Sequence, residues 1–158
     1  MKKLLRFAGL VAFWLGWPVL WVYLRGKART RVIVECQGKI LVVRSLLGTG
    51  KWQLPGGGLH RGEEPSVGAA RELLEETGLS VRASELVPLN EVKTAKHTTI
   101  YGLTFLYYGF VVRIEQLPAL RMQTLEITDI GWMDPADMHA GNTSKDVLAM
   151  LSTWQRTR

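Results

Sequence analysis

The sequence predicts an α/β or α+β sandwich, and three observations support this fold class. Two strand-like runs, at residues 31–36 and 39–46, lie close enough in the chain to form a hairpin. A long β-branched and aromatic run at residues 98–114 is typical of one or two further strands. Helical patterns at residues 65–77 and 145–155 are interspersed with these runs. Strands and helices mixed in this way pack as the layers of a sandwich.

Turn residues mark the connections between these elements. Gln37-Gly38 separates the first two runs and predicts the hairpin turn. A loop is expected after the hairpin, because glycines gather there (Gly48, Gly50 and Gly56 to Gly58). Shorter strands are expected within residues 85–93 and at residues 130–133, and Asp134-Pro135 then starts a helix or a turn.

The bulk composition, with 158 residues of which 47% are hydrophobic and 22% charged, indicates one globular domain. The single cysteine, Cys36, allows no intrachain disulfide, and its apolar surroundings predict a buried, inert thiol. The net charge is +6, but seven basic residues and no acidic residue lie within the first 31 positions. The remainder holds 13 basic and 14 acidic residues, a net charge of −1. The basic character therefore belongs to the N-terminal segment, and no nucleic acid partner is expected.

The N-terminal segment predicts a transmembrane helix. Residues 7–24 form 18 consecutive positions without a charge, which as a helix would span about 27 Å. With Leu4, Leu5 and a snorkelling Arg6, residues 4–24 approach the bilayer thickness of about 30 Å. A cleaved signal peptide and an interfacial or packed helix are the alternatives. The chain thus divides into an apolar helix with a basic linker (residues 1–30) and a second domain (residues 31–158).

The flanking charges predict the orientation of that helix. Three basic residues precede the span and four follow it, and the excess after the span places the C-terminal domain in the cytoplasm. The sequence therefore predicts a single-pass membrane protein whose second domain lies on the cytoplasmic side.

The helix predicted at residues 65–77 combines an apolar arc with an acidic one. Pro65 suits its first position and Gly78 suits the left-handed position that ends it. Four apolar residues are expected on the buried arc (Val67, Ala70, Leu73 and Leu74). Glu72, Glu75 and Glu76 fall on the opposite arc, where they repel one another unless a cation binds. An ordinary solvated acidic face is the alternative. Arg71 precedes Glu75 by four residues and can pair with it.

The spacing over residues 57–79 closely resembles the signature of a known family. Gly57, five residues, Glu63, seven residues and then the run from Arg71 to Leu79 (RELLEETGL) resemble the Nudix box at each defined position. Leu54-Pro55-Gly56 resembles the approach to that box. The resemblance implies the Nudix fold, an α/β/α sandwich around a mixed β-sheet, preceded in this chain by the N-terminal apolar helix. It also implies hydrolysis of a diphosphate linkage in a nucleoside diphosphate derivative.

The resemblance also implies the site residues and the cofactor. The metal ligands would be the carboxylates of Glu72, Glu75 and Glu76 and the backbone carbonyl of Gly56. The ion would be Mg²⁺, with Mn²⁺ as the alternative, because both prefer oxygen ligands. Arg71 would orient the glutamates, and Glu63 would support the site.

Two glutamates are candidates for the base that takes a proton from water. Glu72 is the first. Glu126 is the second, because Glu126-Ile127 followed by Trp132 resembles a downstream element where some family members place a catalytic or metal-binding glutamate. His60 and His97 are expected to be solvated loop residues.

The sequence leaves two hypotheses for the activity and three classes of substrate. A magnesium-dependent pyrophosphohydrolase acting on a small nucleotide derivative, tethered to the membrane, is the first hypothesis. A catalytically silent Nudix-fold module that binds a nucleotide is the alternative. The proline typical of some ADP-ribose hydrolases and the tyrosine of dinucleoside polyphosphate hydrolases are missing near Ala95. Nucleoside triphosphates, nucleotide sugars and membrane-borne diphosphates therefore remain as substrate classes.

Overall fold

A computed structural model describes residues 28–46, 49–89, 97–98, 104–121 and 126–156. The strands are β1 (Ala28–Cys36), β2 (Lys39–Ser45), β3 (Val87–Pro88), β4 (His97–Thr98), β5 (Thr104–Ile114) and β6 (Ile127–Met133). The helices are α2 (Pro65–Thr77) and α3 (Lys145–Arg156), with short 3₁₀ turns η1 (Ala83–Glu85) and η3 (Pro135–Asp137).

The strands form one mixed sheet in the order β3-β5-β1-β2-β6, with β4 paired to β5. β1 runs parallel to β5, and the remaining pairs are antiparallel. The predicted hairpin is confirmed, although its first strand begins at Ala28 and not at Arg31. Gln37 and Gly38 both have positive φ, 50° and 79°, as the favoured two-residue hairpin turn requires.

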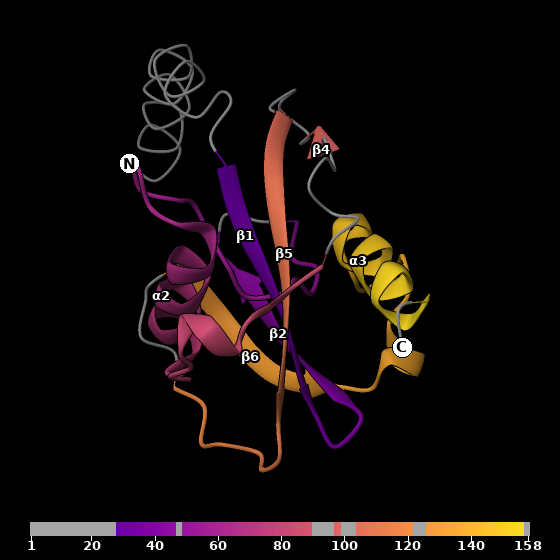
Figure 1. Ribbon diagram of the computed structural model, residues 1–158. Coiled ribbons are helices and arrows are strands. Elements are labelled where there is room, and N and C mark those ends of the chain that lie inside the picture. Colours follow the sequence, from indigo (N-terminus) through magenta and orange to yellow (C-terminus); the bar gives the residue numbers. More distant parts are fainter. Residues whose placement is uncertain (1–27, 47–48, 90–96, 99–103, 122–125, 157–158) are drawn as a thin grey trace, which may run out of the picture.

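Helices α2 and α3 cover opposite faces of this sheet (Figure 1). Because side chains alternate along a strand, Val32 packs with Leu73 of α2, whereas its neighbour Ile33 packs with Val147 and Leu151 of α3. Each fully buried aliphatic side chain contributes about 1.5–3 kcal/mol to folding. The predicted α/β/α sandwich around a mixed sheet is therefore confirmed.

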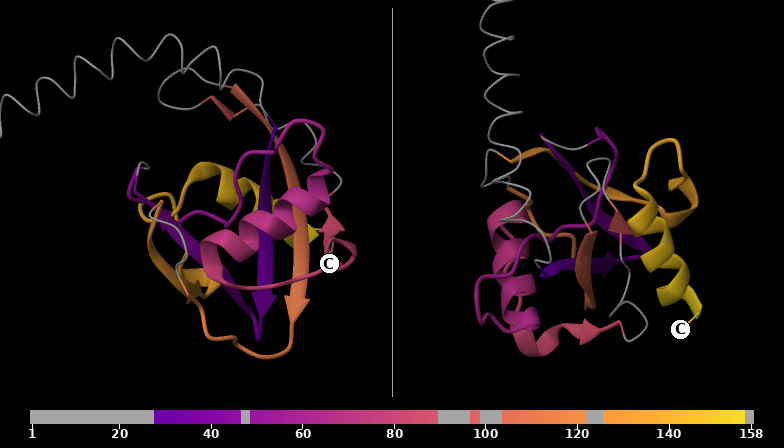
Figure 2. Two further views of the ribbon diagram at one scale, coloured as in Figure 1. Left: turned by 90° about the vertical axis from the view of Figure 1, so that its left-hand side faces the viewer. Right: turned by 90° about the horizontal axis from the view of Figure 1, so that it is seen from above.

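The buried side of α2 differs from the predicted one. Val67 and Leu74 are exposed, at 51% and 42%, whereas the buried positions are Gly68, Ala69, Leu73 and Thr77. Residues 69, 73 and 77 follow the i, i+4, i+8 row, and in the left view of Figure 2 the helix lies across β1 and β5. This rotation turns Glu72 and Glu76 partly inward, because they flank the buried row. The sequence pattern alone did not predict that inward turn.

A loop segment separates β1 from β2 at the end of the sheet where β1 begins. Val43 of β2 and Gln53 exchange two backbone hydrogen bonds of 2.9 Å. On the other side, the amides of Thr30 and Val32 in β1 donate to the carbonyls of Gly57 (2.8 Å) and Pro55 (2.9 Å). Residues 53–57 are therefore held on both sides by strands, which fixes the glycine loop that the sequence predicted.

The prediction of a single-pass membrane protein with a cytoplasmic catalytic domain is wrong. Within the described ranges, no helix is long and apolar enough to cross a bilayer. Helices α2 and α3 have 13 and 12 residues, whereas a transmembrane helix needs about 20. The segment 4–24, to which the predicted apolar helix and membrane contact belonged, lies outside the described residues.

Candidate active site

Arg71 connects the first glutamate of the predicted box to the acidic face of α2. Its Nε and Nη2 atoms donate to the two carboxylate oxygens of Glu63, at 2.9 and 3.1 Å. Its Nη1 atom donates to Glu72 at 2.9 Å and to Glu75 at 3.1 Å. Nη2 also donates to the carbonyl of Gly58 at 3.0 Å. The predicted Arg71–Glu75 pair is therefore present, and the guanidinium holds three carboxylates and the loop together.

Glu63 and Arg71 stabilise each other's charged forms. The hydrogen bonds from Arg71 lower the pKa of Glu63 to about 2. In turn, the hydrogen bonds to Glu63 and Glu72 hold the pKa of Arg71 above its usual range. A two-point arginine–carboxylate pair also fixes the relative orientation of both groups. Glu63 therefore fixes the position of the Arg71 guanidinium, which in turn is hydrogen-bonded to Glu72 and Glu75.

Glu76 lies on the inner side of α2, against the glycine loop. Its Oε2 atom accepts a 2.8 Å hydrogen bond from the amide of Gly56. Burial raises the pKa of Glu76 to about 7, although the Gly56 amide and the charge of Arg31 oppose that rise. Because the opposing interactions are weaker than the effect of burial, a nearby cation would strongly stabilise the charged form of this carboxylate.

Two glycines allow this close approach between the loop and its neighbours. Gly56 has φ 133°, and a Cβ there would lie 2.4 Å from the carbonyl oxygen of Thr30. A Cβ on Gly57 would lie 2.4 Å from Oε2 of Glu72. The loop backbone therefore lies directly against the carboxylate of Glu72, and no other residue type leaves that space.

The three box glutamates differ in their access to solvent. The side chain of Glu72 is 15% exposed and that of Glu75 is 48% exposed, while Glu76 is partly buried. The carboxylates thus run from the inner Glu76, beside Gly56, to the outer Glu75. They offer oxygen atoms at several depths along one side of α2.

Arg31 is a component of the site that the sequence did not reveal. It lies in β1, is 7% exposed, and donates to the carbonyl of Gly56 and to Oε1 of Gln53 (3.2 Å). It also forms an ion pair of 3.7 Å with Asp146 of α3, and its guanidinium lies 5.6 Å from the ring centre of Tyr107. Its alternation with the buried Ile33 is a usable signal, because both residues face α3. From the sequence, Arg31 counts among the basic residues of the N-terminal segment and is therefore not identified as a site residue.

The oxygen donors of this site suit a magnesium ion, although they do not form a complete coordination shell. No group of three acidic, histidine or cysteine side chains converges on one point within the described residues. Mg²⁺ does not require such a cage, because it commonly binds through one or two carboxylates together with waters and substrate phosphates. Glu76 and Glu72 supply such carboxylates next to a loop with backbone carbonyls. The Gly56 carbonyl, predicted as a ligand, accepts a hydrogen bond from Arg31.

The other predicted positions lie outside α2. Glu126 is exposed in the turn before β6, and its carbonyl accepts a 2.7 Å hydrogen bond from the amide of Leu46. His60 lies in a loop with its side chain 72% exposed, as predicted. His97, expected in a loop, lies in β4.

Comparison with known proteins identifies the family. A sequence model of the NUDIX domain matches residues 24–151. The MutT-like protein of Streptomyces ambofaciens is 34% identical over 107 residues, which are 68% of this chain and 62% of that protein. Diphosphoinositol polyphosphate phosphohydrolase 2 of Rattus norvegicus is 38% identical over 71 residues, 44% of this chain and 40% of that protein. The matches therefore span less than two thirds of either relative's length.

Solved structures show the same fold. The NUDIX hydrolase from Nitrosomonas europaea superposes with a TM-score of 0.70 at 22% identity, covering 84% of this chain and 90% of that one. The predicted assignment to a Nudix-type hydrolase is thus confirmed at the level of the family. From the sequence match, the shared fold and the box geometry together, the chain belongs to the NUDIX family.

Proposed function

We propose that the chain is a Mg²⁺-dependent pyrophosphohydrolase that cleaves a diphosphate linkage in a nucleoside diphosphate derivative. The observation that carries this proposal is the inward-facing pair Glu72 and Glu76, which lie against Gly57 and Gly56. A solvated acidic face would not need glycines at contact distance or a guanidinium that grips two of its carboxylates. The arrangement suits a site that gathers negative oxygens around a cation.

The proposed ligands are the carboxylates of Glu72, Glu75 and Glu76, with the Gly56 carbonyl as a further oxygen. Mg²⁺, or Mn²⁺ in its place, would neutralise phosphate oxygens and lower the pKa of a bound water. Arg71 orients Glu72 and Glu75 through its ion pairs at 2.9 and 3.1 Å. Arg31 keeps the Gly56 peptide in place from the opposite side of the loop.

We assign Glu72 as the group that accepts the proton from the attacking water. Its carboxylate is only partly exposed and lies against the loop backbone, so its position is restricted. A general base must lie within hydrogen-bond reach of the proton that it removes, and restricted motion favours that geometry. Glu126 is the second proposed base, and its exposed position in the turn before β6 makes it the less restricted of the two.

The proposed substrate class rests on the family and on the charge of the site. One relative is named for a diphosphoinositol polyphosphate, in which an inositol and not a nucleotide carries the diphosphate. Two arginines and several glutamates lie around one loop, and this arrangement suits a chain of phosphates bridged by a cation. We propose a nucleotide as the carrier of that diphosphate.

A substrate panel tests the proposal. The full chain is incubated with nucleoside triphosphates, nucleotide sugars and dinucleotides, with Mg²⁺ or with EDTA, and phosphate, pyrophosphate and nucleotide products are measured. Turnover of one class that requires Mg²⁺ supports the enzyme. Tight nucleotide binding without product in any reaction would replace the enzyme with a silent binding module.

A further inference from the structure

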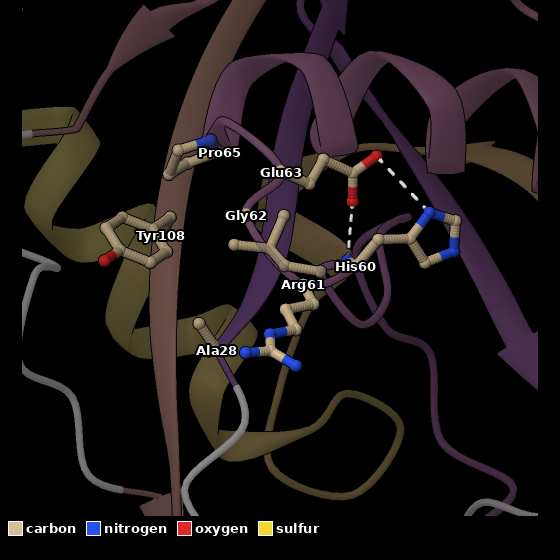
Figure 3. Close-up of a pocket in the computed structure, with 8 residues that line it drawn as sticks. Ala28, His60, Arg61, Gly62, Glu63, Pro65 and Tyr108 are labelled. Atoms are coloured by element: carbon tan, nitrogen blue, oxygen red, sulfur yellow. Dashed lines mark hydrogen bonds and ion pairs between the residues drawn. The ribbon is translucent and has the colours of Figure 1, made fainter.

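A pocket of about 790 Å³ opens beside the N-terminal end of α2. One wall is formed by the start of β1 and by β5, through Ala28 and Tyr108. The facing wall is the turn that carries His60 and Arg61, and Pro65 of α2 adds an apolar surface (Figure 3). Pockets of 300–1,000 Å³ are typical of sites for small ligands. The proposed hydrolysis assigns no role to this pocket.

The turn that forms one wall is held in place by several hydrogen bonds. The amide of Glu63 donates to the carbonyl of His60 at 3.1 Å, and the amide of His60 donates to Oε2 of Glu63 at 2.7 Å. Gly62, with φ 76°, occupies the left-handed position that this tight turn needs. The amide of Leu59 donates to the carbonyl of Ala28 at 3.0 Å, which ties the turn to β1. The wall is thus a formed structure.

One charged side chain in the pocket wall is available to a ligand. The exposed side chain of Arg61 forms no hydrogen bond or ion pair with any residue in the described ranges. Glu63, the carboxylate that lines the pocket, already accepts two hydrogen bonds from Arg71. His60 lies beside Arg61, with Nδ1 3.8 Å from Glu63. An anion is therefore the complementary ligand, because a guanidinium binds phosphate oxygens at two points.

The opposite wall provides a surface for a ring. Tyr108 is partly buried and lies across the pocket from the turn (Figure 3). Tyrosine offers a flat apolar face to a planar group, and the proline ring offers a second apolar contact. Ala28 keeps the space between the two walls open, because its side chain is a single methyl group.

We propose that this pocket binds a phosphate-bearing ring compound of the nucleoside monophosphate class, with its phosphate on Arg61 and its ring on Tyr108. This site is separate from the carboxylates of Glu72 and Glu76. It is connected to them by Glu63, which lines the pocket and fixes Arg71. The ligand is either the distal part of the substrate or a separate effector, and both have the same chemistry.

Binding of AMP to the full chain in EDTA tests the site without any turnover. Titration calorimetry gives the affinity, and amide chemical shifts give the location. Arg61→Gln removes the charge, and we expect binding to weaken at least about ten-fold, because the charge-assisted hydrogen bonds to the phosphate are lost. Ala28→Leu places a larger side chain between the two walls and should also weaken binding, while every charge remains. Arg82→Gln, an equal charge change at an exposed ion pair outside the pocket, should leave binding unchanged.

The outcomes decide the proposal whether or not hydrolysis is found. Chemical shifts at residues 28, 61 and 62, with weaker binding in both pocket variants, support it. Absence of AMP binding, equal affinities in all variants, or shifts confined to residues 72–76 would overturn it. If the protein hydrolyses a nucleotide, a higher KM with unchanged kcat in Arg61→Gln identifies the distal part of the substrate. Loss of an AMP effect on kcat in the same variant identifies a separate effector.

Discussion

The amide of Gly56 donates a 2.8 Å hydrogen bond to the carboxylate of Glu76, and this contact joins the glycine loop to the inner side of α2. The carbonyl of Gly56 accepts a hydrogen bond from Arg31. One peptide therefore connects a glutamate on one face of the sheet to an arginine that reaches α3 on the other. The site is built across the sheet and not on α2 alone.

The raised pKa of Glu76 predicts that the metal-free protein loses stability as the pH rises. The folded-state pKa of about 7 exceeds the ordinary value of 4.5, so the folded protein binds more protons between these values. The contribution of Glu76 to the free energy of unfolding is therefore greatest below about pH 4.5, and it decreases as the pH rises to about 7. The difference corresponds to about 3 kcal/mol at most. Urea unfolding in EDTA at pH 5 and pH 8 measures it.

Glu76→Gln is the matched variant for that pH dependence. Its amide carries no charge at either pH, so the decrease in unfolding free energy from pH 5 to pH 8 should become smaller than in the wild type. Added Mg²⁺ should stabilise the wild type at pH 8 more than it stabilises the variant. An identical pH dependence in both proteins would show that Glu76 is not the group responsible.

Glu63 predicts a pH dependence of the opposite sign at lower pH. Because its folded-state pKa of about 2 lies below the ordinary 4.5, its contribution is present above about pH 4.5 and is lost as the pH falls towards 2. Glu63→Gln should lower the unfolding free energy by about 1–3 kcal/mol at pH 7, with little difference from the wild type at pH 2. Glu85→Gln, at an exposed ion pair, is the control and should change little at pH 7.

Alanine at Gly57 should impair catalysis more than folding. The added Cβ would meet the carboxylate of Glu72 at 2.4 Å, and the flexible end of that side chain can move away. We expect kcat to fall about 100-fold, as for a displaced catalytic group, with a small loss of stability. Steady-state kinetics and thermal unfolding of the same samples separate the two effects. Unchanged kcat would contradict the assignment of Glu72.

Two further alanine variants serve as controls for Gly57→Ala. At Gly56 the added Cβ would meet the backbone carbonyl of Thr30 at 2.4 Å, and backbone cannot move aside. Gly56→Ala should therefore be destabilised by about 3 kcal/mol or more. At Gly58 nothing lies within 4 Å of the added Cβ, so Gly58→Ala should resemble the wild type in both activity and stability.

Arg31→Met should be strongly destabilising because Arg31 is buried and paired on several sides. The variant leaves the Gly56 carbonyl without this donor and Asp146 without its ion-pair partner. Removal of one partner of a buried ion pair costs about 3–5 kcal/mol. Arg31→Lys should recover part of that loss and little of the activity, because an ammonium group cannot reach all the contacts of a guanidinium. Urea unfolding and kcat measure the two effects.

Helix α2 illustrates how much of the structure the sequence could predict. Pro65 at the helix start, Gly78 in the left-handed position (φ 74°) and the Arg71–Glu75 pair all depend on residues close together in the chain. Local spacing is sufficient for such features. The rotation of α2 that exposes Val67 and Leu74 depends on how the helix lies on β1 and β5, and no local pattern contains that information.

Arg31 shows the same limit for the site. Its contacts come from Gly56, Gln53 and Asp146, which lie 25, 22 and 115 positions away in the chain. From the sequence, Arg31 was assigned to the basic residues that flank the N-terminal apolar segment. A count of charges does not distinguish a solvated lysine from a buried arginine. Only the three-dimensional structure brings these segments together.

The most direct test of the proposed metal site is a comparison of turnover in Glu75→Gln, Glu76→Gln and the control Glu64→Gln. Glu64 lies in the same segment but caps the start of α2 through Ser66 and Val67. All three variants are assayed on the substrate that the wild type hydrolyses, over a titration of Mg²⁺. We predict turnover at least about 100-fold lower in the first two variants, with folded protein throughout, and near wild-type turnover in Glu64→Gln. Full activity in Glu75→Gln or Glu76→Gln at matched Mg²⁺ would contradict the assignment of these glutamates to the metal.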